Sequence, residues 1–325
     1  MKTLILKRTK KFFIIPTSPF NFDGTFHKPS HFPNKLKLDD WKPKEYCQTF
    51  RVDRDLFAIV IKDKGTLLRP KLEITIYSRA NLNAQYLEKI KQEIIYRFGL
   101  NFNLSEFNRL IKSDKRFYPI FKKWIGMRSS SQYTLYELLI IAIVLQNTTV
   151  RRSQQMLDSL LASFGTKVSF DNKTLWTIWL PKELENVSEE ELRALKVGYR
   201  AKFIKKLSEN FVDGKVDEFK LRDFDKENTK EELMKLYGVG PETARILLFE
   251  TYHFYDVFDH IAPWQQKIYS RLFYGKKLVS ANKIYNDIKS QYGKYSMLAV
   301  HYIWEDIFWK RTTKNIPWLE KEIRL

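Results

Sequence analysis

Residues 236–244 read LYGVGPETA, and this stretch decides the fold. Its two glycines, Gly238 and Gly240, permit a tight left-handed turn after a helix that we expect to end at Leu236. Pro241 suits the first position of a second helix, because an N–H group would have no helical partner there. The stretch therefore predicts two helices joined by a hairpin. An ordinary glycine-capped turn between two helices is the alternative.

The hairpin also predicts a surface that binds phosphate. Backbone N–H groups at a helix N-terminus are unpaired and attract anions, and glycine lets a nucleic-acid backbone come close. The residues expected to contact DNA here are Gly238, Val239, Gly240, Glu242 and Thr243. The whole chain is basic, with 57 Lys+Arg against 38 Asp+Glu and a net charge of +19, which calls for a polyanionic partner. A lysine-rich composition that serves solubility is the alternative.

A helical period begins near residue 83, and we expect it to continue to the end of the chain. Capping boxes are predicted at 134–137, 188–191 and 229–232. An apolar run at 138–145 precedes a polar loop at 146–149 and a further helix that ends before Gly165.

The first hundred residues are typical of strands and turns. Short β-rich runs occupy 11–15, 46–52, 56–61 and 72–77, and we expect 21–44 to be loop. The fold class predicted is α+β, with a small antiparallel β-sheet domain over 1–110 and an all-α region over 111–325. Within that region we expect one subdomain at 130–228 and a second, made of 111–129 plus 229–325, that carries the hairpin.

The composition excludes several classes of protein. Hydrophobic residues make up 44% and aromatic residues 15% of the 325 residues, which is incompatible with disorder. A lone cysteine, Cys47, excludes a disulfide scaffold, a cysteine zinc finger and an iron–sulfur cluster. The longest apolar run, 138–145, is too short to span a membrane, and charges come too early for a secretory signal. We therefore expect an intracellular monomer without metal or cofactor.

Three further segments accompany the hairpin: the loop QNTT at 146–149, LKVGYRAKF at 195–203 and VFD at 257–259. With them the sequence resembles the helix-hairpin-helix DNA glycosylases, well over 130–325 and loosely over 1–110. Segment 195–203 is similar to the GYRA segment of the 8-oxoguanine branch, and an N-terminal sheet is found in both that branch and the 3-methyladenine branch.

The resemblance implies that Asp259 is the catalytic carboxylate. Cleavage of an N-glycosidic bond develops positive charge at C1′, which a fixed anion in a dry pocket stabilises, and the same anion can activate water. A helix-capping role for Asp259 is the alternative, and Asp256 is the fallback acid. Pro263 predicts that the next helix starts late, so that Asp259 lies in a long turn.

Glu242 occupies the position at which lyase members of the family carry a lysine nucleophile. A carboxylate cannot form an imine, so the resemblance implies an enzyme that releases the base without cutting the strand. Glu242 either lines the base pocket or is a solvated acid at a helix N-terminus. Lys235 and Lys267 flank the region as alternative nucleophiles.

The resemblance also assigns roles around an extracted base. Asn147 lies where the 8-oxoguanine branch has its wedge residue, and Arg152 where it reads the opposite base; a helix N-cap is the alternative for Asn147. The predicted base pocket contains Glu242, His260, Trp264 and Tyr199, with His260 orienting Asp259.

The expected function is that of a monofunctional DNA glycosylase of base excision repair acting on double-stranded DNA with a damaged base. Alkylated purines are the substrates expected, and oxidised guanine is the alternative. A non-catalytic DNA-binding protein that kept the hairpin is the rival from another class.

Overall fold

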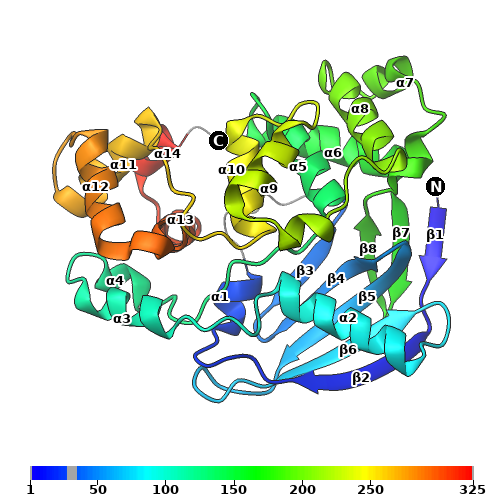
Figure 1. The fold of residues 1–325 in the computed structure, drawn as a ribbon, viewed down its shortest axis with the longest axis horizontal. Helices are drawn as coiled ribbons and strands as arrows, with labels where there is room; N and C mark the ends of the chain where they lie inside the picture. Colours follow the sequence, from blue (N-terminus) through cyan, green and yellow to red (C-terminus); the bar gives the residue numbers. More distant parts are fainter. Residues whose placement is uncertain (1, 28–34, 324–325) are drawn as a thin grey trace.

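The computed structural model describes residues 2–27 and 35–323. Its N-terminal part is an antiparallel sheet of order β2-β6-β5-β4-β3 (Figure 1). The strands are β2 (Arg8–Ile14), β3 (Asp39–Lys42), β4 (Glu45–Val52), β5 (Asp55–Asp63) and β6 (Leu72–Ser78). The predicted strands are confirmed within one or two residues, except that the first begins three residues earlier than expected.

Both faces of this sheet are covered, which explains why β4 and β5 are buried along most of their length. One face, with Phe50, Ile59 and Ile74, packs against α2 (Ala84–Arg97) in a single apolar cluster. The opposite face, with Cys47 and Val60, packs against a second, smaller sheet. Alternation of side chains along each strand sends neighbouring residues to the two cores.

The second sheet corrects the prediction that 111–325 is all-α. It is built from β1 (Lys2–Ile5), β7 (Thr166–Phe170) and β8 (Lys173–Thr177), with β1 parallel to β7 and β7 antiparallel to β8. Val168, Phe170 and Leu175 are buried against the larger sheet. The helical period of the sequence is therefore interrupted by a hairpin that belongs to the β-rich part of the molecule.

The expected loop at 21–44 is also partly wrong. It contains a short helix, α1 (Phe22–Phe26), capped by the Asn21 side chain, and the edge strand β3. Phe22 and Phe26 enter the core under the large sheet, and this burial holds a helix of only five residues in place. Residues 28–34, which include two of the prolines on which the loop prediction rested, lie outside the described residues.

The remaining helices surround one continuous apolar core. In chain order they are α3 (Ser105–Ser113), α4 (Tyr118–Phe121), α5 (Leu135–Leu145), α6 (Val150–Phe164), α7 (Glu189–Ala194), α8 (Arg200–Val212), α9 (Lys226–Met234), α10 (Pro241–Glu250), α11 (Pro263–Tyr274), α12 (Ala281–Tyr292), α13 (Ser296–Thr313) and α14 (Pro317–Glu322). Short 3₁₀ turns lie at Pro181–Leu184 (η1), Lys220–Asp223 (η2) and Gly293–Tyr295 (η3). Among the described helices, none combines the length and the apolar character needed to cross a membrane.

Two of the three predicted capping boxes are confirmed, at Thr134 and Ser188. The third is wrong, because α9 begins earlier and is capped by Asp225. Thr229 is fully buried inside that helix, where its hydroxyl donates to the carbonyl of Asp225 at 2.7 Å. Position 225 offers a carboxylate acceptor for the first free N–H groups, so the helix starts there.

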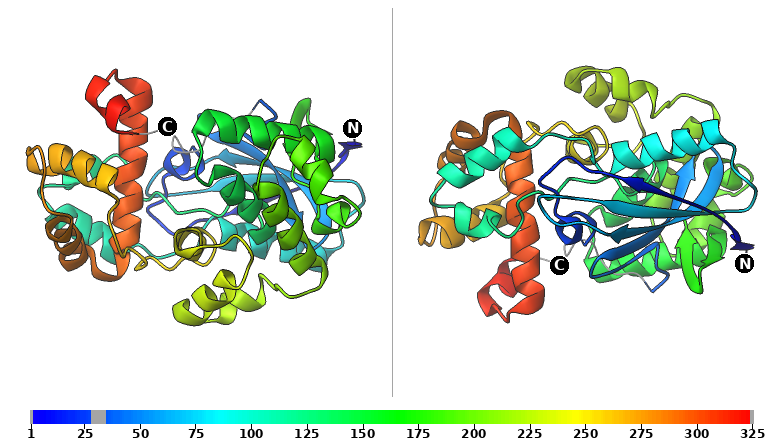
Figure 2. Two further views of the ribbon diagram at one scale, coloured as in Figure 1. Left: turned by 90° about the horizontal axis from the view of Figure 1, so that it is seen from above. Right: turned by 90° about the horizontal axis from the view of Figure 1, so that it is seen from below.

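The helical part is arranged around α10 (Figure 1). Helices α5, α6, α8 and α9 lie on one side of α10, and α11 to α14 lie on the other, together with α3 and α4. The long helix α13 runs the length of that second group (Figure 2). The domain boundary at 110/111 stays a prediction.

Candidate functional site

The hairpin between α9 and α10 uses its two glycines differently. Gly238 has φ +89°, and a Cβ atom there would lie 2.7 Å from Cδ2 of Phe203. Gly240 has φ −94° and caps α10 in an extended conformation, and a Cβ atom added there would have no described atom within 4 Å. The prediction that both glycines make the left-handed turn is therefore wrong for Gly240. Helix α9 ends at Met234, two residues earlier than expected.

The N-terminus of α10 is open. Pro241 is its first residue, as predicted, and within the described chain no side chain caps its first turn. Val239 is only 8% exposed, so this residue offers its backbone rather than its side chain to a ligand. The N–H groups of Glu242 and Thr243 therefore point toward solvent at the positive end of the helix.

Three loops are tied together beside the hairpin. The Gln146 side-chain amide donates to the carbonyl of Gly238 at 2.8 Å. Arg200 donates to the carbonyls of Ile143, at 3.1 Å, and Gln146. The polar loop, the 195–203 segment and the hairpin thus form one connected surface.

Asn147 stands out on this surface. It is exposed and has φ +48°, while Thr149 is the residue that caps α6 through Arg152 N–H. The alternative that Asn147 is an N-cap is therefore wrong. Arg152 is partly buried and donates to the carbonyl of Lys196, which orients its guanidinium toward the 195–203 segment.

Four charged or polar side chains meet where α10 faces the loop at 257–262. His260 lies between the two acids, with Nδ1 2.9 Å from Asp259 Oδ1 and Nε2 3.1 Å from Glu242 Oε1. Arg245 donates to Glu242 Oε2 at 2.7 Å, and its Nε is 3.6 Å from Asp259 Oδ1. We call Glu242, Arg245, Asp259 and His260 the α10 charge cluster. It brings Asp259 and His260, which lie in the long turn expected before α11, together with Glu242 at the start of α10.

The surroundings of Asp259 differ from the expected dry pocket. Its side chain is 59% exposed and that of Glu242 57% exposed, whereas Arg245 is only 14% exposed. The sequence reasoning missed Arg245, although its position one turn after Glu242 on α10 is the spacing at which such side chains pair. The ligand atoms of Glu242, Asp259 and His260 lie within 4.8 Å of one another, but Arg245 contacts both carboxylates, and its positive charge opposes a metal cation there.

The fallback acid Asp256 lies in a different environment. Its carboxylate pairs with Lys226 at 2.7 Å, and its carbonyl accepts from Lys289 at 3.0 Å. Burial lowers the pKa of Lys289. Lys289 is a half-buried amine near Asp259 that the sequence reasoning did not consider. The two lysines that it did consider, Lys235 and Lys267, are more than half exposed and pair with surface glutamates.

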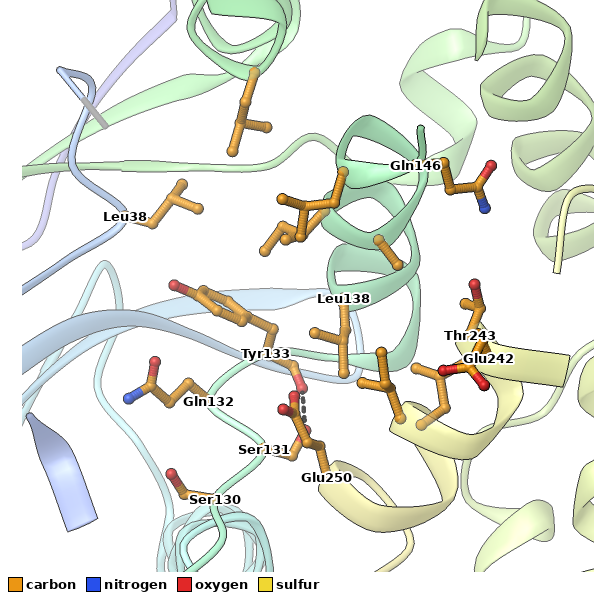
Figure 3. Close-up of a pocket in the computed structure, with 16 residues that line it drawn as sticks. Leu38, Ser130, Ser131, Gln132, Tyr133, Leu138, Gln146, Glu242, Thr243 and Glu250 are labelled. Atoms are coloured by element: carbon orange, nitrogen blue, oxygen red, sulfur yellow. Dashed lines mark hydrogen bonds between the residues drawn. The ribbon is translucent and has the colours of Figure 1, made fainter. Parts of the chain in front are cut away.

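Two cavities flank α10. The first, of about 420 Å³, lies between α5 and α10; its walls are mainly apolar, and Gln146, Glu242 and Thr243 lie together at one side (Figure 3). The second, of about 280 Å³, lies between α10 and α13 and is lined by Trp304, Phe308 and other apolar side chains together with Glu250, Glu305 and His301. Ser130, Ile246 and Glu250 border both cavities.

Three of the four predicted pocket residues, His260, Trp264 and Tyr199, line neither of the two cavities. Trp264 packs on Trp304, with ring centroids 5.0 Å apart, and so lies one layer behind the second cavity. Tyr199 belongs to a row of rings with Phe203 and Tyr237, at centroid distances of 5.3 Å and 5.2 Å, on the outer side of the hairpin. Of the predicted pocket residues, Glu242 borders the first cavity and His260 contacts Glu242, while the pocket as a whole stays a prediction.

Comparison with curated proteins finds relatives among DNA glycosylases. The chain is 28% identical over 227 residues to the N-glycosylase/DNA lyase of Saccharomyces cerevisiae, which covers 66% of this chain and 58% of that protein. It spans between 58% and 66% of the length of the curated relatives it matches. No family model matches the sequence.

Solved structures share the fold over nearly the whole chain. The 3-methyladenine DNA-glycosylase of Archaeoglobus fulgidus has a TM-score of 0.71 at 16% identity, over 91% of this chain and 99% of that one. The apo form of the Clostridium acetobutylicum 8-oxoguanine glycosylase/lyase has a TM-score of 0.65 at 18% identity, over 92% and 99% of the two chains. The fold is thus common to proteins named for alkylated and for oxidised bases.

Proposed function

We propose that this chain, whose curated relatives and structural neighbours are DNA glycosylases, is itself a helix-hairpin-helix DNA glycosylase that hydrolyses the N-glycosidic bond of a damaged base in double-stranded DNA. The observation that carries the proposal is the position of Asp259. Its carboxylate lies beside the open N-terminus of α10 and next to Glu242, which borders a cavity. A DNA strand held by the hairpin amides would bring a sugar to this carboxylate and a flipped base to a cavity.

In the proposed reaction Asp259 stabilises positive charge at C1′ and orients the attacking water. His260, at 2.9 Å, fixes the carboxylate. Asn147, exposed and with φ +48°, fills the space that the base leaves. Arg152, held on the carbonyl of Lys196, contacts the opposite base. The hairpin from Gly238 to Thr243 contacts phosphates.

We propose alkylated purines as the substrate. The cavity between α10 and α13 combines the rings of Trp304 and Phe308 with two acids, Glu250 and Glu305. Such a lining attracts a base that carries positive charge, as many alkylated purines do. Oxidised guanine is the second candidate, favoured by the 195–203 segment and by the name of the yeast relative.

The experiment is a panel of otherwise identical duplexes, each with one lesion, assayed in single turnover. Release of a methylated purine with little release of 8-oxoguanine supports the proposal, and the reverse selects the second candidate. Binding to all duplexes without release of any base would identify a non-catalytic DNA-binding protein instead. Because the hairpin, the charge cluster and both cavities come from one chain, we expect a monomer to be active. The dependence of the rate on protein concentration tests this expectation.

We further propose that the enzyme lacks lyase activity, since Glu242 offers no amine. The product should be an intact strand with an abasic site, and borohydride should trap no protein–DNA adduct. Glu242→Lys should gain such an adduct, which would show that position 242 faces C1′. A strong adduct in the unmutated protein would contradict the proposal, and loss of that adduct in Lys289→Ala would identify the nucleophile.

A further inference from the structure

We infer that Glu242 is a positioning residue that holds Arg245 away from Asp259, so that the catalytic carboxylate keeps its negative charge available to the reacting sugar. The inference rests on the proposed glycosylase function. It gives Glu242 a role that is neither contact with the flipped base nor simple solvation at a helix end.

The distances within the α10 charge cluster show that Arg245 interacts more closely with Glu242 than with Asp259. Its Nη2 donates to Glu242 at 2.7 Å, whereas its Nε lies 3.6 Å from Asp259 Oδ1, too far for a hydrogen bond. That Nε is buried and has no hydrogen-bond acceptor within the described part of the chain. A buried charged donor without an acceptor is costly, so loss of the Glu242 charge would turn Arg245 toward Asp259.

His260 adds a second link between the two acids. Its ring nitrogens lie 2.9 Å from Asp259 and 3.1 Å from Glu242. Glu242 therefore also fixes the imidazole ring, which in turn positions Asp259. The guanidinium end of Arg245 is fixed from behind by Met297, whose sulfur is 3.4 Å from Nη1. Lys289, on α12, is a further cation whose charge interacts with Asp259 and Asp256, and Lys226 pairs with Asp256 at 2.7 Å.

The charge count explains why Glu242 matters to the reaction. Two carboxylates and one guanidinium sum to −1, and glutamine at position 242 makes the cluster one unit more positive, whatever charge His260 carries. When the C1′–N bond breaks, its electron pair leaves with the base and the sugar becomes positive. Water then bonds to C1′ and gives one proton to Asp259. A cationic alkylated base leaves as a neutral molecule and needs no proton, whereas an uncharged base leaves as an anion and takes up a proton from solvent. The cluster that is one unit more negative stabilises the cationic sugar more strongly.

The first test measures this field without any catalysis. The probes are two identical duplexes, one with a protonated pyrrolidine in place of a deoxyribose and one with a neutral tetrahydrofuran there. Wild type should bind the cationic duplex more tightly, because it resembles the transition state. Glu242→Gln should lower this preference by about tenfold, the size expected for loss of one nearby charge. Arg245→Met should raise it, because both carboxylates then lack the guanidinium, and the double variant Glu242→Gln/Arg245→Met should recover most of what Glu242→Gln loses.

The second test follows single-turnover base release. Glu242→Gln should slow release by about tenfold or more and the double variant should recover part of that loss, while affinity for undamaged DNA does not fall, because a negative charge beside the phosphates is removed. Glu189→Gln is the matched control: Glu189 also lies in the first turn of a helix, α7, and pairs with Arg193 at 2.6 Å. This control should change neither the cation preference nor the rate.

The outcomes separate the inference from the proposed function. An unchanged cation preference in Glu242→Gln, or a parallel loss in Arg245→Met without recovery in the double variant, would overturn the inference and leave the function standing. A wild type without any cation preference would overturn it as well. If wild type releases no base from any duplex, yet its cation preference depends on Glu242 as described, the function fails while the electrostatic role stands.

Discussion

The molecule contains two clusters of arginine and carboxylate that differ in burial and in charge balance. In the first, Glu93 of α2 accepts from Arg97 at 2.7 Å and from Arg222 at 2.6 Å and 2.8 Å, and Glu93 and Arg97 are only 6% and 2% exposed. In the second, the α10 charge cluster, two acids that are more than half exposed share one arginine.

The pKa of Glu93 shows what the first arrangement does. Burial raises this pKa, but the hydrogen bonds from Arg222 and the charge of Arg97 outweigh burial and lower it to about 2. One acid between two arginines is locked as a structural anion. Two acids on one arginine leave one negative charge uncompensated, which is what a reaction through a cation requires. The two clusters thus differ both in burial and in the ratio of acids to arginines.

The largest effect on base release is expected from substitution of Asp259. Asp259→Asn keeps the shape and removes the charge, so base release should fall by about two orders of magnitude while DNA affinity is nearly unchanged. Single-turnover release and binding to undamaged duplex measure the two quantities. Comparable release by the variant would show that another acid carries the reaction.

The structural acid should behave in the opposite way. Glu93→Gln leaves Arg97 and Arg222 buried without their anion, which should lower the free energy of unfolding by about 3 kcal/mol. Urea denaturation measures this change. Glu242→Gln, at a position open to solvent, should change stability by less than about 1 kcal/mol. Equal losses in the two variants would show that the two clusters do not differ in their contribution to stability.

Acid should weaken the fold through the same residue. Since the pKa of Glu93 is lower in the folded chain than its ordinary value of 4.5, its stabilising contribution is present above pH 4.5 and is lost as the pH falls toward about 2. The contribution amounts to roughly 3 kcal/mol at most. Unfolding followed at a series of pH values should show a shallower decline in Glu93→Gln than in wild type.

The smallest effects concern the hairpin glycines. Gly238→Ala forces a left-handed residue against Phe203, so it should lower stability by about 1–2 kcal/mol and weaken binding to damaged and undamaged DNA alike. Gly240→Ala meets no described atom within 4 Å and should leave stability unchanged. Weaker binding by Gly240→Ala, measured beside its melting temperature, would show that a DNA backbone approaches this residue closely.

Local patterns predicted a large share of this fold. The apolar run of α5, the proline at the start of α11 and the alternation in β6 each depend on neighbouring residues alone, and these elements are where they were expected. Strands β7 and β8 were missed because each has five residues and becomes stable only by packing on a distant sheet. The capping box predicted at 229–232 was wrong because a threonine followed by a glutamate three residues later also fits a threonine that is buried within a helix.

The site was predicted in part for a similar reason. Asp259 and the hairpin could be located because motifs mark them, although their roles stay predictions. The pairing of Glu242 with Arg245 follows from helical spacing, whereas the contact of His260 with Glu242 depends on the path of the 251–262 connection. Tyr199 was placed in the pocket because aromatic character alone does not indicate on which side of the hairpin a ring lies.

The parallel pairing of Lys2–Ile5 with Thr166–Ser169 bears on how the protein is made. On the ribosome, β1 emerges first and has no partner until α6 and the residues after it have been synthesised, so the small sheet closes late. Until then the face of the large sheet that carries Cys47 and Val60 lacks the Val168, Phe170 and Leu175 side chains that cover it. A bulky fusion placed directly before β1 should therefore slow maturation and increase aggregation more than the same fusion placed after α14.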